Sequence, residues 1–520
     1  MEKLTILLEI INIIIPILAL CLTTLIHLHM FQLNSYQIKS HFNRIKQNPG
    51  QLLPDIIIGA AGLASLFMNT VSALVYTNCL FVLAIILNKP KKAKKPMVYT
   101  TRIKRHLTLY IIYFAIIIAL SNIYFGTTGR ICAISALYLL SFVSLVITAL
   151  ICKPFEKAIS NSYINDAKKI LASKSDMKII GVTGSYGKTS VKYYLNTLLK
   201  AKYNVLMTPG SFNTPMGVVR TIREHLSATH EIFVCEMGAR HVGDIKEICD
   251  IVYPHDGIIT SVGPQHLETF YTLDNIKKTK FELADSLGND GLLFLNMDDE
   301  NVASYSKGRK YIAYGINNKE GYYAENINVS ERGTSFTAVS PNGEKCEYNT
   351  KLIGMHNVLN IVGAIAVANT YGIPMESLRS QVRKLECVPH RLELKDHGNV
   401  AIIDDAYNSN PSGAKAALEV FGVFDGYKIL VTPGMVELGE KQDECNYEFG
   451  ANAAKVSDFV ILVGKKQTES IFKGLADSGF NKDKIYVADK IEEAINKAYA
   501  INSQGKKKFI LLENDLPDNY

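Results

Sequence analysis

Apolar residues are distributed unevenly along this 520-residue chain, with long uninterrupted runs in the first 150 residues and shorter, spaced runs afterwards. Each long run has about 20 residues or more, the length that an α-helix needs to cross the hydrocarbon core of a bilayer. A signal peptide is the alternative for the first run, but no small-residue cleavage site follows it. We therefore expect residues 1–152 to form a helical membrane region. The runs predict about four spans, at residues 4–26, 56–87, 107–125 and 131–151.

Lysine and arginine set the expected orientation, because the cytoplasmic loops of membrane proteins are enriched in these residues. Residues 89–105 are strongly basic. The loop between the third and fourth predicted spans, in contrast, has Arg130 as its only lysine or arginine. The pattern predicts that the 89–105 loop, both chain termini and the rest of the chain lie in the cytoplasm. The loop of residues 30–55 is then expected outside, although it is also basic.

Beyond residue 177, short apolar runs alternate with stretches of helical periodicity, which predicts an α/β fold. The first group of runs is typical of buried parallel strands in a doubly wound sheet, where ligands bind beside the carboxyl ends of the strands. Alternating residues around an Asn-Gly pair predict a small β insertion at about residues 321–351. The runs of the first group lie at residues 178–182, 231–235, 257–260 and 291–295.

A second group of apolar runs predicts another α/β domain of the Rossmann type near the end of the chain. These runs lie at residues 427–431, 459–463 and 508–512. We therefore expect a central domain over residues 153–388 and a C-terminal domain over residues 389–520.

Composition narrows the possible functions. The formal net charge of +7 is modest, and the sequence has no stripe of basic and aromatic residues that would suggest nucleic-acid binding. The nine cysteines are scattered without a CxxC pair, so neither a zinc site nor a disulfide framework is expected. This cysteine usage fits a reducing cytosol for the α/β part of the chain.

A glycine-rich segment joins the first predicted strand to a predicted helix at residues 191–200. Such a turn directs backbone N–H groups and the positive end of the helix dipole at a phosphate. Lys188 adds a cation for the β- and γ-phosphates, and Thr189 adds a hydroxyl for Mg²⁺. The glycine spacing is shorter than in the strict Walker form, and an ordinary turn is the alternative. The pattern predicts an ATP site at Gly184, Ser185, Tyr186, Gly187, Lys188, Thr189 and Ser190.

Polar side chains also follow the neighbouring predicted strands. Glu236 ends one strand, His266 lies after the next, and Lys280 lies on a following helix. Mg²⁺ prefers oxygen ligands and shares them with substrate phosphates, which suits Glu236. Each of the three residues has an ordinary alternative when taken alone: Glu236 as a strand-end cap or salt-bridge partner, His266 as a loop histidine and Lys280 as a solvated lysine. Their joint placement after a phosphate loop predicts a metal site beside the nucleotide.

These segments resemble those of the Mur ligases, the ATP-dependent amide ligases that build peptidoglycan precursors. The resemblance implies that Thr189, Glu236, His266 and Lys280 hold Mg²⁺, with Lys280 carbamylated so that it becomes an anionic oxygen ligand. The similar segments of the central domain are residues 183–189, 211–214, 236–239, 260–268, 280–283 and 354–360.

The resemblance continues into the C-terminal domain at residues 388–393, 403–411 and 434–439. The last two segments are similar to the branch of the family that adds D-alanyl-D-alanine. Helix caps, turns, packing and surface positions are the ordinary alternatives for the residues concerned. The resemblance implies nucleotide contacts at Asn357, Asn360, Arg391 and Asp405, and substrate contacts at Asn213, Thr214, Tyr407 and Asn408.

By resemblance, a substrate carboxylate attacks the γ-phosphorus of ATP, and an amine then displaces phosphate from the resulting acyl-phosphate. We therefore expect a ligase in a bacterial plasma membrane, with cytoplasmic catalytic domains that use ATP and Mg²⁺. The expected substrates are D-alanyl-D-alanine and a muramoyl-tripeptide. Membrane lipids and other enzymes of cell-wall synthesis are further expected partners.

Two departures from the family leave alternatives open. Membrane spans occupy the position at which soluble members carry a UDP-binding domain. The substrate that supplies the carboxylate is then a muropeptide linked to a polyprenyl lipid. Alternatively, it is the soluble UDP-linked precursor, and the spans only anchor the enzyme. The acidic segment at residues 511–520 lies where soluble members carry a Lys-Gly-Ser-Arg-like segment. An amine substrate other than D-alanyl-D-alanine is therefore an alternative. A non-catalytic ATP-binding scaffold is a rival. An ATP-driven transporter is disfavoured, because Glu9 is the only ionisable residue found in the first predicted span, with His27 and His29 at its edge.

Overall fold

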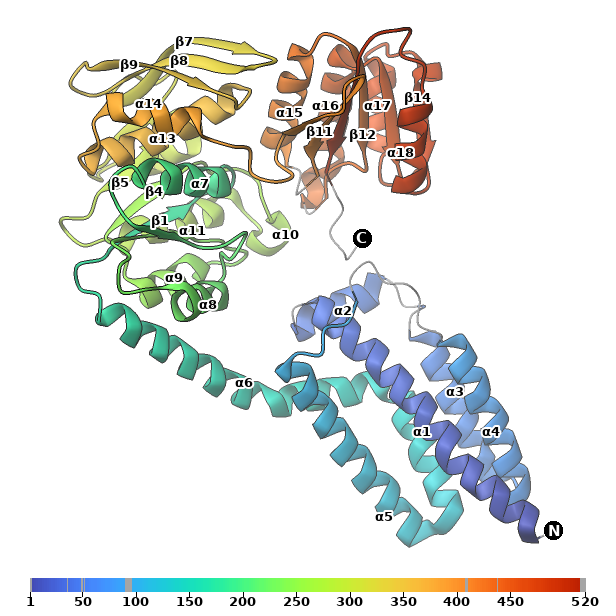
Figure 1. Cartoon of the computed structure of the whole chain (residues 1–520). Coiled ribbons are helices and arrows are strands. Elements are labelled where there is room, and N and C mark those ends of the chain that lie inside the picture. Colours follow the sequence, from blue (N-terminus) through green and yellow to red (C-terminus); the bar gives the residue numbers. More distant parts are fainter. Residues whose placement is uncertain are drawn as a thin grey trace. The chain divides into compact units, whose positions relative to one another are not determined.

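The computed structural model describes residues 2–34, 36–47, 50, 52–88, 96–406, 410–436 and 438–514. The described residues form two compact units, one up to Ser162 and the other from Tyr163 onward. The first unit is helical and the second is built from helices and two sheets (Figure 1). This is the predicted combination of an apolar helical region with α/β domains.

Large apolar side chains are exposed along the helices of the first unit, as on a surface that faces hydrocarbon rather than water. Among the described residues, three helical stretches are long and apolar enough to cross a membrane: Ile6–Leu33, Thr70–Leu87 and Thr101–Leu139. The helices of this unit are α1 (Glu2–Leu33), α2 (Ile38–Gln47), α3 (Leu53–Leu63), η2 (Ala64–Phe67), α4 (Thr70–Leu87), α5 (Thr101–Leu139) and the first part of α6 (Ser141–Ala172).

The prediction of one span over residues 56–87 is wrong, because α3 and η2 end before α4 begins. Met68 is extended, and the side chain of Asn69 caps α4 by accepting a hydrogen bond from Ser72 N. Asn12 donates to Thr77 Oγ1 at 2.9 Å, and Asn88 donates to Thr23 Oγ1 at 2.8 Å. Both pairs are separated by the same 65 residues, so α1 and α4 run parallel.

This chain reversal corrects the predicted orientation. Gln32, at the end of α1, donates to Val98 O at 2.8 Å, so the start of the 30–55 loop lies beside the segment that precedes α5. The loop is therefore at the same end of the unit as the basic start of α5, and not at the opposite end. The N-terminal end of α1 lies at the other end. The most basic stretch, residues 89–95, lies outside the described residues.

The turn expected between the spans at residues 107–125 and 131–151 is present, at Gly126 within α5, where φ is 61° and ψ is −151°. The prediction of one span over residues 131–151 is wrong, because α5 ends at Leu139 and α6 begins at Ser141. The second half of α5 ends at Leu139 and packs closely on α3. A Cβ on Gly59 would lie 2.5 Å from Leu139 Cα, so α3 needs glycine there. The predicted span is therefore divided between α5 and α6.

In the second unit, the first sheet has the order β2-β3-β1-β4-β5-β6-β7-β8-β9 and carries helices on both faces. Its neighbouring strands are parallel from β2 as far as β7. α7 (Lys188–Leu199) and α13 (Met355–Thr370) pack on one face, and α8 (Pro215–His225), α9 (Asp244–Val252) and α11 (Leu273–Asp285) on the other. The predicted insertion is the antiparallel set β7–β9. The strands are β1 (Lys178–Thr183), β2 (Val205–Met207), β3 (Ile232–Glu236), β4 (Asp256–Ile259), β5 (Leu293–Asn296), β6 (Ile312–Gly315), β7 (Tyr322–Ser330), β8 (Gly333–Val339) and β9 (Lys345–Thr350).

The second sheet has the order β10-β11-β15-β12-β13-β14, with only β10 antiparallel to its neighbour among the described strands. Its apolar side chains pack against helices on both faces, as expected for the second α/β domain. The strands are β10 (Glu393–Asp396), β11 (Val400–Asp405), β12 (Tyr427–Thr432), β13 (Phe459–Val463), β14 (Ile485–Ala488) and β15 (Lys508–Glu513). The helices are α15 (Pro411–Val423), α16 (Gln442–Val456), α17 (Glu469–Asp477) and α18 (Ile491–Ala500).

Candidate active site

The glycine-rich segment forms a tight turn between the carboxyl end of β1 and the start of α7. Gly184 and Gly187 both have positive φ angles, 149° and 80°. A Cβ on Gly187 would lie 2.8 Å from Asn360 Oδ1, so a larger residue would push the Asn360 side chain aside. The turn therefore presents backbone at the N-terminus of a helix, which is an arrangement that binds phosphate.

Lys188 lies folded over this loop. Its Nζ donates to the carbonyl oxygens of Gly184 and Ser185 at 2.7 and 3.0 Å. Burial lowers the pKa of Lys188 to about 8, against the opposing effect of the Glu236 carboxylate. Displacing these two carbonyl contacts would turn the ammonium toward a bound phosphate.

The segment after β4 packs against the phosphate loop and fixes its shape. Ser185 Oγ donates to Gly263 O at 3.0 Å, and the Tyr186 hydroxyl donates to Pro264 O at 3.1 Å. Tyr186 N donates to Ser261 Oγ at 2.9 Å. Ser185 and Tyr186 thus hold the loop, while Gly187 and Ser190 line the adjoining cavity.

Glu236, at the end of β3, is the centre of a buried polar cluster. Its Oε1 accepts hydrogen bonds from Thr189 Oγ1 at 3.2 Å and from Asn213 Nδ2 at 3.1 Å. Its Oε2 lies 2.9 Å from Lys192 Nζ, and both side chains are almost completely buried. Burial raises the pKa of Glu236, but the charges of Lys192 and Lys188 outweigh it and the net pKa is lowered.

Lys192 was not predicted from the sequence. It lies one helical turn after Lys188 on α7, a spacing that puts both side chains on one face of the helix. That spacing was the available signal, but a lysine on a helix is ordinarily solvated.

The residues beside the loop fit a magnesium ion by their chemistry. Thr189 and Glu236 offer a hydroxyl and a carboxylate close to the phosphate loop, and Mg²⁺ favours such oxygen ligands. Lys192 occupies one side of the carboxylate, which leaves Oε1 as the oxygen that faces Thr189.

Lys280 lies on α11 and is 1% exposed. Burial lowers its pKa well below the usual value for lysine, and the charge of Lys188 lowers it further. The neutral amine that results is the form able to react with carbon dioxide. His266 precedes α10 (Leu267–Phe270) and has a φ of 52°, a conformation uncommon outside glycine.

A cavity of about 330 Å³ lies where the two α/β domains of the second unit meet. Asn357, Asn360, Arg391 and Asp405, expected at the nucleotide, all line it. Asn357 also has a structural role, because its Oδ1 accepts a hydrogen bond from the Tyr194 hydroxyl at 2.7 Å. Burial raises the pKa of Asp405 to about 6, although Arg391 opposes the shift. Lining residues that the sequence reasoning missed are Asn296, Asp298, Asp299, His356, Asn410 and Ser412.

Of the four residues expected at the substrate, the two that the structure describes differ in their surroundings. The side chain of Asn213 donates to Glu236, and its backbone carbonyl oxygen accepts a hydrogen bond from Gly238 N. Thr214 caps α8 by accepting a hydrogen bond from Gly217 N at 3.3 Å, which is its ordinary structural role. Tyr407 and Asn408 lie outside the described residues.

A phosphate loop, a polar site at the ends of parallel strands and a second α/β domain across one cavity define a nucleotide-binding protein of the P-loop class. The Mur ligase middle domain matches residues 182–368, and the Mur ligase glutamate ligase domain matches residues 390–512. The two matches together cover more than half of the chain. The chain therefore belongs to the Mur ligase family.

Individual relatives agree with this assignment. The chain is 32% identical to UDP-N-acetylmuramoyl-tripeptide–D-alanyl-D-alanine ligase of Escherichia coli strain K12, over 56% of the chain and 65% of that protein. It is 33% identical to the ligase of the same name from Bacillus subtilis strain 168, over 53% of the chain and 60% of that protein. The chain thus spans less than two thirds of these relatives.

Solved structures show the same fold. The structure of MurF from Acinetobacter baumannii has a TM-score of 0.62 and 25% identity, and the match covers 69% of this chain and 78% of that one. MurF ligase from Thermotoga maritima in complex with ADP has a TM-score of 0.61 and 26% identity, with 68% and 80% covered. The family matches begin at residue 182, so the helical first unit lies outside them.

Proposed function

We propose that the protein is an ATP-dependent ligase that joins D-alanyl-D-alanine to the tripeptide of a muramoyl-peptide precursor of peptidoglycan. The observation that carries this proposal is the convergence of the phosphate loop, Glu236 and the cavity residues at one edge of the first sheet. The relatives' names supply the acid and the amine.

The proposed reaction has two steps. A carboxylate oxygen of the tripeptide attacks the γ-phosphorus of ATP, and ADP leaves with the electrons of the broken P–O bond. The amine of the dipeptide then attacks the acyl carbon, loses a proton and expels phosphate. A free carboxylate has a poor leaving group, which is why the first step is needed.

The residues of this chain contribute mainly charge and position. The loop N–H groups and Lys188 offset the charge of the phosphates as two anions approach each other. Asn360 and Arg391, which both line the cavity, would hold the nucleotide between the domains. Closure of the second α/β domain would exclude the water that otherwise hydrolyses an acyl-phosphate.

Thr189, Glu236, His266 and carbamylated Lys280 are the proposed holders of Mg²⁺. When bound, Mg²⁺ supplies Lewis-acid polarisation and charge neutralisation at the phosphoryl group. A carbamate at Lys280 suits its buried, weakly basic amine. Retention of these residues together favours a catalyst over an ATP-binding scaffold.

Membrane insertion of the first unit is also part of the proposal. Its three long apolar helices and exposed apolar side chains support insertion. Arg102, Lys104 and Arg105 begin α5, at the end of the unit where α1 stops. By the positive-inside rule we assign this end to the cytoplasm and the N-terminal end of α1 to the outside of a plasma membrane.

The test is product formation by the full-length protein in lipid nanodiscs, with ATP, D-alanyl-D-alanine and a muramoyl-tripeptide, followed by mass spectrometry. The expected product is the pentapeptide, formed with equal amounts of ADP and phosphate. Lys188→Ala should abolish product, whereas Lys200→Ala, at the end of the same helix, should leave it unchanged. ATP hydrolysis without any peptide product, whichever carrier is offered, would contradict the proposal.

A further inference from the structure

A short segment at residues 208–214 joins β2 to α8 beside the proposed metal ligand Glu236. β2 pairs in parallel with β3, so the segment leaves the same carboxyl edge of the first sheet at which Glu236 ends β3. Ligands of such sheets bind beside this edge. The segment therefore lies where a substrate has to come in order to present a carboxylate to a nucleotide on the phosphate loop.

Among the described residues, little apolar packing holds this segment in place. Gly210 and Ser211 are exposed, and a Cβ on Gly210 would lie at least 4 Å from every described residue beyond its chain neighbours. Phe212 is half-buried, and the Arg220 guanidinium lies 5.5 Å from the centre of its ring. A segment with few buried apolar contacts depends on its polar contacts to keep one shape.

The polar contacts of the segment converge on Glu236. The backbone N–H of Glu236 donates to Thr208 Oγ1 at 3.1 Å, and Asn213 Nδ2 donates to Glu236 Oε1 at 3.1 Å. Between these two points, Gly210 O accepts a hydrogen bond from Lys192 Nζ, the same ammonium that pairs with Glu236 Oε2. Each carboxylate oxygen of Glu236 is thus linked to the segment, one directly and one through Lys192.

Lys192 is suited to this link more than to holding the fold together. Its side chain has no exposed surface, and the carboxylate that it pairs with is equally withdrawn from water. Removing both charges from water costs about as much as their attraction returns, so two apolar side chains of similar volume would join α7 to β3 as well. An apolar side chain has no donor, however, whereas an ammonium has enough N–H groups to reach Gly210 O and Glu236 Oε2 together.

The carboxylate of Glu236 also faces the phosphate loop, because its Oε1 accepts a hydrogen bond from Thr189 Oγ1 at 3.2 Å. Thr189 directly follows Lys188 in that loop. A nucleotide with a divalent cation adds charges of both signs beside these residues, and charges act strongly on one another in a site from which water is excluded. A change in how Glu236 is held is therefore passed on to Lys192 and Asn213.

We propose that Lys192 and Asn213 are positioning residues that couple the 208–214 segment to the nucleotide site, so that the segment is held for the carboxylate substrate when nucleotide and Mg²⁺ are bound. This inference rests on the proposed ligase function and deepens it, because it names the side chains that prepare the segment beside the reacting carboxylate. It also gives Lys192 a role beyond its pairing with Glu236.

Hydrogen exchange of the full-length protein in lipid nanodiscs tests the coupling without any turnover. Saturating Mg²⁺ and β,γ-methylene-ATP, which cannot transfer its phosphate, should slow exchange of the backbone amides of residues 208–214 by about tenfold. In Lys192→Met the slowing should fall to about twofold or less, because the ammonium that joins Gly210 to Glu236 is gone. Amides of the phosphate loop should be slowed in both proteins, which shows that the variant folds and binds nucleotide.

A second variant is needed because Lys192→Met leaves the buried Glu236 without its partner. Asn213→Ala removes the direct contact with Glu236 and keeps the ion pair, so the fold is retained, and it should also lose most of the slowing at 208–214. Lys200→Ala, at the exposed end of α7, is the matched control and should behave like the unmodified protein. Full slowing of the segment in either test variant, or no slowing in the unmodified protein, would overturn the proposal.

Calorimetry separates the coupling from a merely structural role. The dissociation constant of the muramoyl-tripeptide precursor is measured with and without Mg²⁺ and β,γ-methylene-ATP, using the UDP-linked form or, where only that form is turned over, the lipid-linked one. The ratio of the two constants should be about ten in the unmodified protein and close to one in Lys192→Met. A structural defect would weaken both binding events and leave the ratio unchanged.

The outcomes also separate this inference from the proposed function. An unchanged ratio in Lys192→Met would overturn the coupling while the ligase function stands. Absence of peptide product from the unmodified protein, with either form of the precursor, would overturn the ligase function instead.

Discussion

Lys192 Nζ lies 2.9 Å from Glu236 Oε2, and this ion pair joins the helix of the phosphate loop to the strand that carries the proposed metal ligand. Both side chains are withdrawn from solvent, so neither charge has water to stabilise it. The pair also orients Glu236 so that its other oxygen faces Thr189. Lys192 is therefore a positioning residue for the site.

Removing one member of this pair should be more damaging than removing both. Lys192→Met leaves Glu236 buried without its partner, which costs roughly 3–5 kcal/mol in comparable pairs. The double variant Lys192→Met, Glu236→Gln should recover much of that stability. Thermal unfolding of the four proteins in nanodiscs provides the double-mutant cycle, and strictly additive effects would refute the coupling.

ATP binding should weaken as pH rises through about 8. The pKa of Lys188 is lowered to about 8 by burial, so the ammonium that attracts phosphate is lost above that pH. Calorimetric titration with ATP between pH 6.5 and about 9 tests this. Lys188→Arg should flatten the pH dependence, because arginine stays charged throughout the range. An identical slope in the variant would exclude Lys188 as its origin.

Lys280→Ala should reduce turnover by about 100-fold or more, because the proposed carbamate is part of the electrostatic site. Lys278→Ala, an exposed position on the same helix, is the control and should have little effect. Carbon-13 NMR after incubation with labelled bicarbonate should show a carbamate signal that Lys280→Ala lacks. A signal that persists in the variant would assign the carbamate to another lysine.

Asp405→Asn should stabilise the protein near neutral pH. Burial raises the pKa of Asp405 from 3.8 to about 6, so folding favours the protonated acid. The protonated Asp405 side chain stabilises the fold fully below the unfolded-state pKa, and this contribution is lost as pH rises through about 6. The difference in melting temperature between variant and parent should therefore be largest at pH 7 and vanish near pH 4. A constant difference would refute the assignment.

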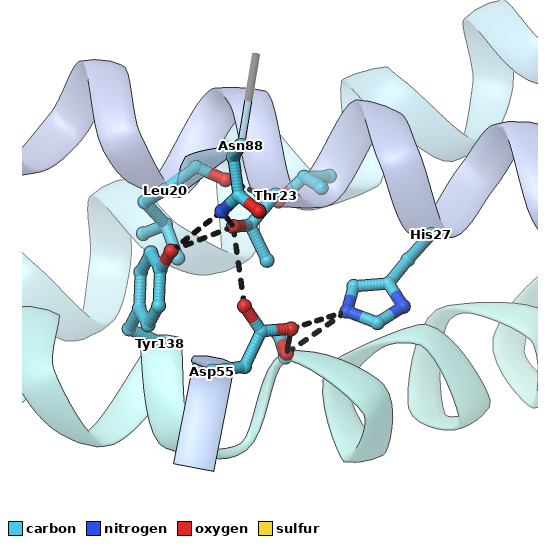
Figure 2. Close-up of polar contacts among 8 residues, drawn as sticks. Leu20, Thr23, His27, Asp55, Asn88 and Tyr138 are labelled. Atoms are coloured by element: carbon cyan, nitrogen blue, oxygen red, sulfur yellow. Dashed lines mark hydrogen bonds and ion pairs between the residues drawn. The ribbon is translucent and has the colours of Figure 1, made fainter. Parts of the chain in front are cut away.

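Asp55→Ala should lower the melting temperature of the nanodisc-embedded protein markedly, because it leaves His27 (Figure 2) and Ser141 without their acceptor. The loss is comparable to that of other broken buried pairs, about 3 kcal/mol. Ser72→Ala is a mild control, since its backbone and not its side chain takes part in the α4 cap. Equal effects of the two changes would contradict a structural role for the buried His27–Asp55 pair.

The sequence was informative where local chemistry decides the structure. The strand before Gly184 and the helix after Lys188 were both predicted, because a phosphate loop requires particular residues at fixed spacing. The roles of Asn357, Asn360, Arg391 and Asp405 remain predictions, but these residues do line one cavity. Their meeting depends on how two domains pack, which only the family resemblance could supply.

The helical unit was predicted less well for a physical reason. The run at 56–87 is uniformly apolar, and hydropathy alone cannot distinguish one long span from a hairpin. Asn69 was the available sign, since it is a good helix cap in an otherwise apolar stretch. The partnership of His27 with Asp55 depends on that hairpin, so the sequence could not show it.

The central claim, phosphorylation of a substrate carboxylate, is tested most directly with a tripeptide whose reacting carboxylate carries oxygen-18. The carboxylate oxygen that attacks the γ-phosphorus leaves with phosphate when the amine attacks the acyl carbon. Mass spectrometry of the products should therefore find one heavy oxygen in phosphate and one in the new amide. Unlabelled phosphate from a reaction that consumes ATP would contradict the account and would indicate simple hydrolysis.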